Sequence, residues 1–242
     1  MTPTNPDPRR QLLARLLADL PLPPSADPLA QPITVLIPDP ARAARGWLKL
    51  WPFSHLGLGA GALIETPPTW LPELAHLANR PTTLADLTAL WPASPVTIVP
   101  AKWLPPGALR PAPPPPGYTL RPLTAADQPA YHTFYATCGD SVTDTHLRWG
   151  LPHTAALWRG TDLACVAALY LWHDLWSVVV ATHPAHVNRG LARAAVSALC
   201  AEPPDARPIT YRYFADNHPS ARVATILGFE DWFTTYNLPR PT

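Results

Sequence analysis

Residues 178–196 read Val178-Val179-Val180-Ala181-Thr182-His183-Pro184-Ala185-His186-Val187-Asn188-Arg189-Gly190-Leu191-Ala192-Arg193-Ala194-Ala195-Val196 and are the most informative segment of this chain. Its β-branched beginning predicts a strand and its alanine-rich end predicts a helix. Between them, Pro184, Asn188 and Gly190 predict a loop. The first N–H groups of a helix have no partner inside the helix, so this arrangement aims several of them at one point. That point suits a pyrophosphate group.

A second stretch lies about thirty residues farther along the chain and reads Asn217-His218-Pro219-Ser220-Ala221-Arg222-Val223-Ala224-Thr225-Ile226-Leu227-Gly228-Phe229. Together the two stretches resemble the GCN5-related N-acetyltransferases. The pyrophosphate loop of that family reads Val-x-Pro-x-x-Gln/Arg-x-x-Gly-x-Gly/Ala, and its later segment reads Asn-x-x-Ser/Ala…Leu-Gly-Phe. The resemblance covers Tyr118 to Leu238, roughly half of the chain.

The loop matches the family pattern at three of its positions, which are Pro184, Gly190 and Ala192. Thr182 stands in the place of the valine. Val187 departs from the pattern, because Gln or Arg is usual there and steadies the loop or reaches the phosphates. Valine can do neither, so we expect a lower cofactor affinity or a compensating contact from Arg189.

The expected fold class is α/β, with the mixed central sheet of the acyl-CoA N-acyltransferase type, preceded by a smaller α/β domain. The clearest boundary is a run of prolines, which favours an extended polyproline II segment. We therefore expect an N-terminal α/β domain of unknown role over residues 1–110, a proline-rich linker over 111–117 and an acetyltransferase-like domain over 118–242.

Local signals predict the elements of the first half. Asp7 and Pro8 are typical of a helix start, and leucines from Leu12 to Leu20 recur at helical spacing. Asp39 and Pro40 predict a short helix that ends near Gly46. Thr69 and Thr82 are expected to cap helices through residues 78 and 91. The expected strands are 33–37, 47–51, 62–66 and 96–99.

The second half alternates in the same way. Thr124 is expected to cap a helix through Cys138, and Gly228 to end a helix. The other expected helices follow the phosphate loop to about residue 201 and span 219–227. The expected strands are 118–123, 154–158, 163–171, 176–182, 209–214 and 233–238.

The resemblance implies acetyl-CoA as cosubstrate and assigns its contacts. The pantetheine arm would pair with the main chain at a strand edge formed by Val180, Ala181 and Thr182. The pyrophosphate would bind the N–H groups of Asn188, Arg189, Gly190, Leu191 and Ala192, with help from the helix dipole. Arg189 and Arg193 add charge-assisted contacts. The side-chain amide of Asn217 would bond the pantetheine, although an N-cap role fits that residue equally well.

Acetyl transfer needs a neutral amine, a donor for the oxyanion and a proton for the leaving thiolate. The family often places a tyrosine four residues before the glycine of Leu-Gly-Phe, and here Ala224 stands at that position. Tyr211 and Tyr213 on the preceding strand are candidates to replace it, with core packing as the alternative. His173 and Asp174, at the turn before the phosphate-loop strand, are candidates for the base. His183 and an ordered water are further alternatives.

Other groups have weaker signals. Five aromatic residues either line an acceptor pocket or pack in the core: Trp149, Trp158, Tyr170, Trp172 and Trp176. Asp140 and Asp144 are candidates for meeting a cationic amine. The segment Gly57-Leu58-Gly59-Ala60-Gly61 suggests a nucleotide loop, but a flexible turn explains it as well because the residues before it are not typical of a strand.

Composition limits the remaining function classes. The chain has 242 residues, 47% of them hydrophobic, and a formal net charge of +1, which argues against nucleic-acid binding by bulk electrostatics. Its three cysteines do not suggest a disulfide framework or a zinc site, and we expect no bound metal. The chain shows no signal sequence or membrane span, so we expect a cytoplasmic protein with no membrane partner. The oligomeric state is left open, a homodimer included.

The sequence thus predicts an acetyl-CoA-dependent N-acetyltransferase that acts on a small amine or a peptide N-terminus by direct nucleophilic attack. Direct attack is expected because no cysteine or serine lies in an obvious nucleophile context. The alternatives are a catalytically degenerate acyl-CoA-binding or interaction module, and a nucleotide-dependent oxidoreductase that uses the first half.

Overall fold

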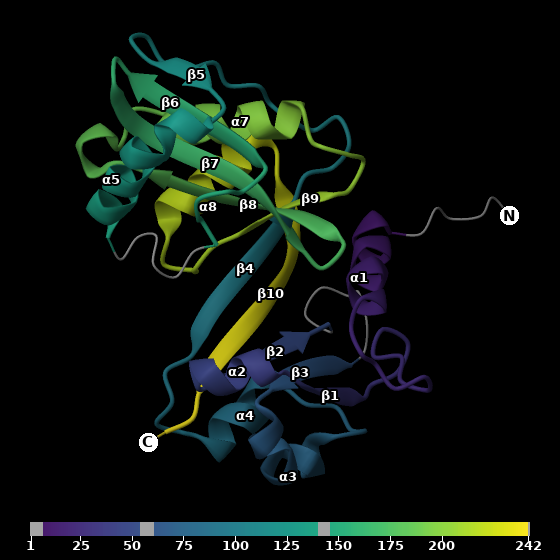
Figure 1. Ribbon diagram of the computed structural model, residues 1–242. Coiled ribbons are helices and arrows are strands. Elements are labelled where there is room, and N and C mark those ends of the chain that lie inside the picture. Colours follow the sequence, from purple (N-terminus) through teal and green to yellow (C-terminus); the bar gives the residue numbers. More distant parts are fainter. Residues whose placement is uncertain (1–6, 54–60, 140–145, 242) are drawn as a thin grey trace, which may run out of the picture. The chain divides into compact units, whose positions relative to one another are not determined.

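The computed structural model describes residues 7–53, 61–139 and 146–241, apart from the side chains of residues 43 and 44, and Figure 1 labels its helices and strands. The described residues form two compact units. The first unit contains the residues up to Ala101, together with Tyr213–Asp216 and those from Asp231 onward. The second unit contains the rest, from Lys102 to Arg212 and from Asn217 to Glu230. The predicted linker at residues 111–117 lies within the second unit in this division.

The first unit combines a mixed sheet with short helices. Its strands follow the order β1-β3-β2-β10-β4, with β1 and β3 parallel and β2 and β3 antiparallel. Apolar residues from β2, β3, α3 and α4 form its core. In chain order the elements are α1 (Pro8–Ala18), β1 (Thr34–Pro38), α2 (Pro40–Arg45), β2 (Trp47–Pro52), β3 (Ala62–Thr66), η2 (Pro68–Trp70), α3 (Leu71–Leu74), η3 (Ala75–Leu77), α4 (Leu84–Leu90), β4 (Thr97–Trp103) and β10 (Glu230–Pro239).

Two predicted helix starts in the first unit are confirmed. The side chain of Asp7 accepts a hydrogen bond from the N–H of Arg9 at 2.9 Å and caps α1. The side chain of Asp39 caps α2 in the same way, and α2 ends at Gly46 as expected. In both helices proline is the first residue, where its missing N–H costs no hydrogen bond.

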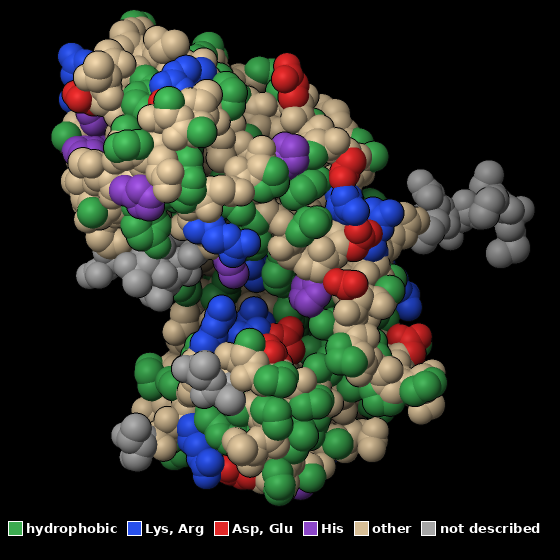
Figure 2. Space-filling model, in the orientation of Figure 1, with side chains coloured by type: hydrophobic (Ala, Val, Ile, Leu, Met, Phe, Trp, Pro, Cys, Tyr) green, Lys and Arg blue, Asp and Glu red, His purple; other side chains and the backbone are tan. Residues whose placement is uncertain are grey.

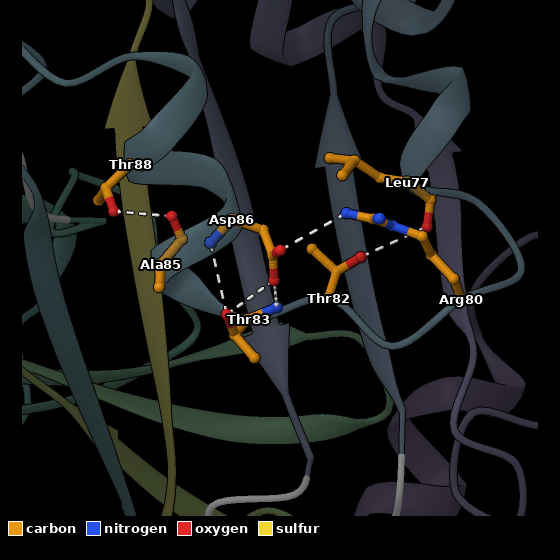
Figure 3. Close-up of polar contacts among 7 residues, drawn as sticks. All are labelled: Leu77, Arg80, Thr82, Thr83, Ala85, Asp86 and Thr88. Carbon is orange, nitrogen blue, oxygen red and sulfur yellow. Dashed lines mark hydrogen bonds and ion pairs between the residues drawn. The ribbon is translucent and has the colours of Figure 1, made fainter.

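The start of α4 corrects one prediction by a single residue (Figure 3). The hydroxyl of Thr83, not of Thr82, accepts from the N–H of Asp86, and the N–H of Thr83 donates to the Asp86 carboxylate at 2.7 Å. The Thr82 hydroxyl donates instead to the carbonyl of Leu77 at 3.3 Å. The prediction for Thr69 is also wrong, because Thr69 lies inside η2, which begins after Pro67.

The sheet of the second unit consists of antiparallel strand pairs and one parallel pair. The strand order is β5-β6-β7-β8-β9, with only β8 and β9 parallel, and the end of β4 lies next to β9. The mixed sheet confirms the predicted α/β class. The elements are β5 (Thr119–Arg121), η4 (Ala125–Asp127), α5 (Gln128–Cys138), β6 (His153–Arg159), β7 (Asp162–Trp172), β8 (Leu175–Thr182), η5 (Pro184–His186), α7 (Leu191–Ala201), β9 (Ile209–Arg212) and α8 (His218–Leu227).

Helices cover both faces of this sheet. Tyr131, Phe134 and Cys138 of α5 form one apolar cluster with Val179 and Ala181 of β8. Helix α7 also contacts β6, β7 and β8, yet none of its residues belongs to that cluster. We infer that α7 lies on the opposite face. The face covered by α5 is called the α5 face below.

The proline-rich segment is bonded to the second unit. The N–H of Arg110 donates to the carbonyl of Leu227 at 3.0 Å, and the N–H of Ala112 donates to the Ser197 hydroxyl at 2.9 Å. Gly228 ends α8 as predicted, with φ of 97°. A Cβ at Gly228 would lie 2.1 Å from the carbonyl oxygen of Ala108, so close approach of this segment requires glycine.

Some predictions fall outside the described residues, namely Asp140, Asp144 and residues 57–60 of the glycine-rich segment. Gly61 is described, and its N–H donates to the carbonyl of Pro28 at 2.9 Å. Every helix in the described part of the chain falls short of the length and hydropathy that crossing a bilayer requires.

Candidate functional site

Strand β8 is paired along its whole length on one side and along only half of it on the other. Its pairing with β7 continues to Thr182, whereas its pairing with β9 ends at Val178 and Tyr211. From Val179 onward, the edge of β8 that faces away from β7 therefore has no strand partner among the described residues. Main-chain groups of a strand point alternately to its two sides. The N–H of Trp176 donates toward β9 and that of His183 donates to Ala164 beside β7, so the free edge presents the main-chain groups of Val180 and Thr182. The main-chain groups of Ala181, also a predicted contact, face β7 instead.

The loop that follows β8 leads directly to the open N-terminus of α7. Asn188 has φ of 61° and Gly190 has φ of 78°, a left-handed conformation that glycine adopts freely and asparagine more readily than most residues. Gly190 is the N-cap and provides no side-chain cap. Within the described structure, no acceptor bonds the N–H groups from Asn188 to Arg193. This is the arrangement predicted to hold a pyrophosphate, with the positive end of the helix dipole behind it.

The reason for glycine at position 190 is conformational. A Cβ at Gly190 would meet only Nη2 of Arg193, at 3.7 Å, which is an ordinary contact distance. The left-handed φ, not a clash with the protein, therefore disfavours other residues there. The same measurement places the Arg193 guanidinium beside the N-terminus of α7, where it can meet an anion.

Arg189 is held by Tyr118, a residue that no sequence motif indicates. Nη1 of Arg189 donates to the hydroxyl of Tyr118 at 3.4 Å, and that hydroxyl lies 2.9 Å from Nδ1 of His186. Burial lowers the pKa of His186, and the neighbouring His183 and Arg189 lower it further. A neutral His186 accepts the Tyr118 proton, which leaves the phenol oxygen to accept from Arg189. No local motif joins Tyr118 to residues some seventy positions away.

The structure also shows the surroundings of Val187 and Ala224, the two positions at which this chain departs from the family pattern. Val187 is 50% exposed, so it neither packs under the loop nor offers a polar group. Ala224 is fully buried in α8, so the usual tyrosine position has no phenol. Asn217 caps α8 by accepting from the N–H of Ser220 at 3.1 Å, which leaves its NH₂ group without a partner among the described residues.

The candidates for proton transfer lie in different places. Tyr211 is buried at the last pair between β8 and β9, and the Ser220 hydroxyl donates to its hydroxyl at 3.0 Å. Tyr213 belongs to the first unit. His173 and Asp174 form the turn before β8, about 13 Å along the strand from the end of that pairing. Asp174 accepts from Nε of Arg207 at 2.8 Å.

The structure also contains buried polar atoms that no sequence motif indicates. Nε of Arg212, the hydroxyl of Ser177 and the hydroxyl of Tyr131 are buried and have no hydrogen-bond partner within the described residues. Burial raises the pKa of Tyr131, so its phenol stays protonated. All three belong to the second unit.

Charge is distributed without separation by sign on the face that Figure 2 shows, where basic and acidic side chains are interspersed on both units. An anionic ligand on that face would therefore depend on local groups. The open edge of β8, the N–H groups before α7 and the guanidinium groups of Arg189 and Arg193 are such a local set in the second unit.

No protein-family model and no curated protein sequence matches this chain. Solved structures do resemble it. A GCN5-related N-acetyltransferase from Kribbella flavida has 19% sequence identity and a TM-score of 0.53, over 66% of this chain and 64% of that chain. A GCN5-related N-acetyltransferase from Sphaerobacter thermophilus has 16% identity and a TM-score of 0.53, over 72% and 65%.

A third structure, described as a functionally unknown conserved protein from Staphylococcus epidermidis ATCC 12228, has 10% identity and a TM-score of 0.50, over 73% of this chain and 82% of that one. The matches span just under two thirds of the two acetyltransferase chains. At these identities the similarity concerns the fold. We conclude that this chain has the fold of the GCN5-related N-acetyltransferases.

Proposed function

We propose that the second unit binds acetyl-CoA and transfers its acetyl group to the amine of a small molecule or a peptide N-terminus. One observation carries the proposal: the free edge of β8 leads within a few residues to a helix N-terminus whose N–H groups have no acceptor in the described structure. A strand edge offers partners for the amides of pantetheine. A helix N-terminus offers partners for a pyrophosphate.

The contacts follow from this geometry. The main-chain groups of Val180 and Thr182, on either side of Ala181, pair with the pantetheine arm. The N–H groups of Asn188, Arg189, Gly190, Leu191 and Ala192 receive the pyrophosphate, and the guanidinium groups of Arg189 and Arg193 neutralise it. The Asn217 amide, oriented by its capping bond, donates to the pantetheine. The Tyr118 contact with Arg189 supplies the support that Val187 cannot give.

The reaction is a direct transfer. The lone pair of the amine nitrogen attacks the thioester carbonyl carbon, a C–N bond forms and the C–S bond breaks. The nitrogen loses a proton and the thiolate gains one, so the products are an N-acetyl compound and coenzyme A. Burial raises the pKa of the Cys138 thiol to about 11 and those of Cys165 and Cys200 to about 12, so none supplies a thiolate nucleophile at neutral pH.

Tyr211 is the candidate that best fits as proton donor to the thiolate. It lies where β8 and β9 separate, and it is the pairing partner of Val178. The Ser220 hydroxyl donates to the oxygen of Tyr211 at 3.0 Å, which fixes the position of this phenol beside α8. Ser220 and Ala224 are both on α8, so a phenol held by Ser220 replaces one carried by position 224.

The alternative is a module that binds acyl-CoA without turning it over. The absence of a phenol at Ala224 and the exposed Val187 favour it. Calorimetry with coenzyme A, acetyl-CoA and NAD, followed by an assay of coenzyme A release across a panel of amines, separates the candidates. We expect binding of both coenzyme A forms, no binding of NAD, and amine-dependent release. Binding without release would favour the module, and NAD binding alone would favour an oxidoreductase.

The Tyr211→Phe variant tests the proton donor. We expect kcat to fall about 100-fold while acetyl-CoA affinity is retained, because general-acid catalysis contributes on that order. Tyr236→Phe, in β10, is the matched control. Unchanged kcat in Tyr211→Phe would show that the hydroxyl serves packing with Ser220 only.

A further inference from the structure

Arg212 is the first residue of β9 beyond its pairing with β8. The last pair joins Val178 to Tyr211, and side chains of a strand alternate between its faces. Arg212 therefore shares a face with Thr210, two residues before it. Thr210 pairs with Ser177 of β8, and Ser177 pairs with Tyr170 of β7. Since Tyr170 packs against the cluster that contains α5, Arg212 lies on the α5 face, where β8 and β9 separate.

Aromatic groups hold the guanidinium of Arg212. Its Nη2 donates to the hydroxyl of Tyr170 at 2.7 Å, and its Cζ lies 3.8 Å from the ring centroid of Trp172. Tyr170 in turn stacks on His146, with ring centroids 4.4 Å apart. These contacts fix the side chain and give it cation–π attraction, but they bring no negative charge.

The lack of a carboxylate distinguishes Arg212 from comparable residues. Five of the described arginines are buried or half-buried, and Arg212 is one of them. Each of the other four forms an ion pair with at least one acidic side chain: Arg9 with Asp7, Arg42 with Asp39 and Glu65, Arg121 with Asp127, and Arg207 with Asp174 and Asp205. Arg212 has no such partner in the described residues, and its Nε is buried without an acceptor. A partly desolvated cation of this kind attracts an anion strongly.

Two further donors share the α5 face. The Ser177 hydroxyl is fully buried without a partner in the part of the chain that the structure describes, and it lies in the row that runs from Tyr170 to Thr210. Tyr131 of α5 belongs to the cluster that packs on this face, and its protonated phenol also has no acceptor there. The face thus combines a guanidinium with unused hydroxyl groups, which suits a ligand rich in acceptor oxygens.

We propose that Arg212 binds a carboxylate of the acceptor, so that the substrate class is an amino carboxylate, with the amine and the carboxylate in one molecule. This inference rests on the proposed function, because it places the acceptor where β8 and β9 separate. Nη2 is used by Tyr170, and Nε retains a donor for the carboxylate. Trp172 and Tyr170 add aromatic surface beside it. The nearby positive charge also favours the neutral, nucleophilic form of the amine.

The test compares amines that differ only in charge. The probes are glycine, β-alanine, 4-aminobutyrate and 4-(aminomethyl)benzoate, each with its primary amide, and the readout is coenzyme A release. We expect at least one acid to be preferred over its amide by about 10- to 100-fold in kcat/KM, the range that a charge-assisted contact supplies. In Arg212→Gln this acid-to-amide ratio should fall to about one. In Arg212→Lys it should fall only partly, because lysine keeps the positive charge but lacks the planar guanidinium group, whose several N–H donors can bind both oxygens of a carboxylate.

Controls separate this inference from the proposed function. Coenzyme A affinity, measured by calorimetry on each variant, reports the proposed function independently of the acceptor. Arg222→Gln, an exposed arginine of α8, should keep the wild-type ratio. If no probe is acetylated, calorimetric binding of the acids and amides to the coenzyme A complex replaces the ratio of rates. The inference is overturned if no acid is preferred, or if Arg212→Gln keeps the preference.

Discussion

Two of the connections from a strand to a following helix, β1 to α2 and β8 to α7, differ in how the helix begins. In the first unit, β1 leads to α2 through Asp39, whose carboxylate accepts from the N–H of Ala41 at 2.9 Å and also pairs with Arg42. In the second unit, β8 leads to α7 through Gly190, which offers no side-chain cap. The first connection satisfies its helix N-terminus internally, and the second leaves it open.

The comparison shows which features of the β8–α7 connection the proposed pyrophosphate site requires. A capping carboxylate occupies the N–H groups that an anion would need, and its charge repels a phosphate. Pro40 removes one more donor, since proline has no N–H. At α7 the cap is missing, the backbone of Gly190 is left-handed, and Arg193 stands beside it. The open end costs helix stability, and binding of an anion recovers that cost.

The largest effect is expected from giving the open connection the carboxylate of the closed one. Gly190→Asp should weaken coenzyme A binding by about 100-fold or more, because the new carboxylate repels the pyrophosphate and competes for its N–H groups. Gly190→Ala is the matched control. It carries at least as much backbone strain as Gly190→Asp, about 1–2 kcal/mol of stability, without the charge. Calorimetry should show only a small loss for Gly190→Ala, and equal losses in both variants would contradict the placement of the pyrophosphate.

Removing the cations at the open connection should have a smaller effect. Arg189→Gln and Arg193→Gln should each weaken coenzyme A binding by about fivefold, and the loss should shrink as salt is raised, because exposed charges are screened. Titrations at low and high ionic strength measure this. Arg222→Gln should bind like the wild type, and a loss independent of salt would point to a structural role for the arginines.

Opening the closed connection should affect stability and not binding. Asp39→Ala removes the cap of α2 and one partner of the buried Arg42, so unfolding in urea should show a loss of about 1 kcal/mol. Coenzyme A affinity should stay as it is. A change in affinity would mean that the first unit takes part in cofactor binding.

The smallest effect concerns the support under Arg189. The pKa of His186 is lowered in the folded state, so the unfolded state binds more protons at mildly acidic pH. The stabilisation by neutral His186 is fully present above the ordinary pKa near 6.5 and is lost as the pH falls below it. Urea unfolding at pH 7.5 and 5.5 should show a decrease that is smaller in His186→Asn. The exposed His76→Asn variant should decrease as the wild type does.

Local chemistry explains why much of the fold follows from the sequence. Asp7 with Pro8, Asp39 with Pro40, and Gly228 mark helix ends within a few residues, and the structure confirms each of them. The same capping rules cannot choose between two adjacent residues of the same type. Thr82 and Thr83 can both cap a helix, and only the contact with Leu77 decides that Thr83 does so.

Some residues of the candidate site can be predicted from nearby residues in the sequence, and others cannot. The strand, the loop and the helix around Gly190 follow from residues that are close in sequence. Tyr118, which holds Arg189, and Arg212, which lies where β8 and β9 separate, have no local signal. Their environments arise from strands and helices that are distant in sequence, so no spacing rule selects them.

Residues that are close in sequence specify that a β-branched strand leads through a glycine turn into a helix with free N–H groups, because backbone preferences act over a few residues. The packing of distant segments, and no local pattern, determines that β9 leaves β8 after Val178 and that Arg212 has no carboxylate partner in the described structure. Those features depend on how the strands and α5 pack, which residues of one segment cannot specify alone.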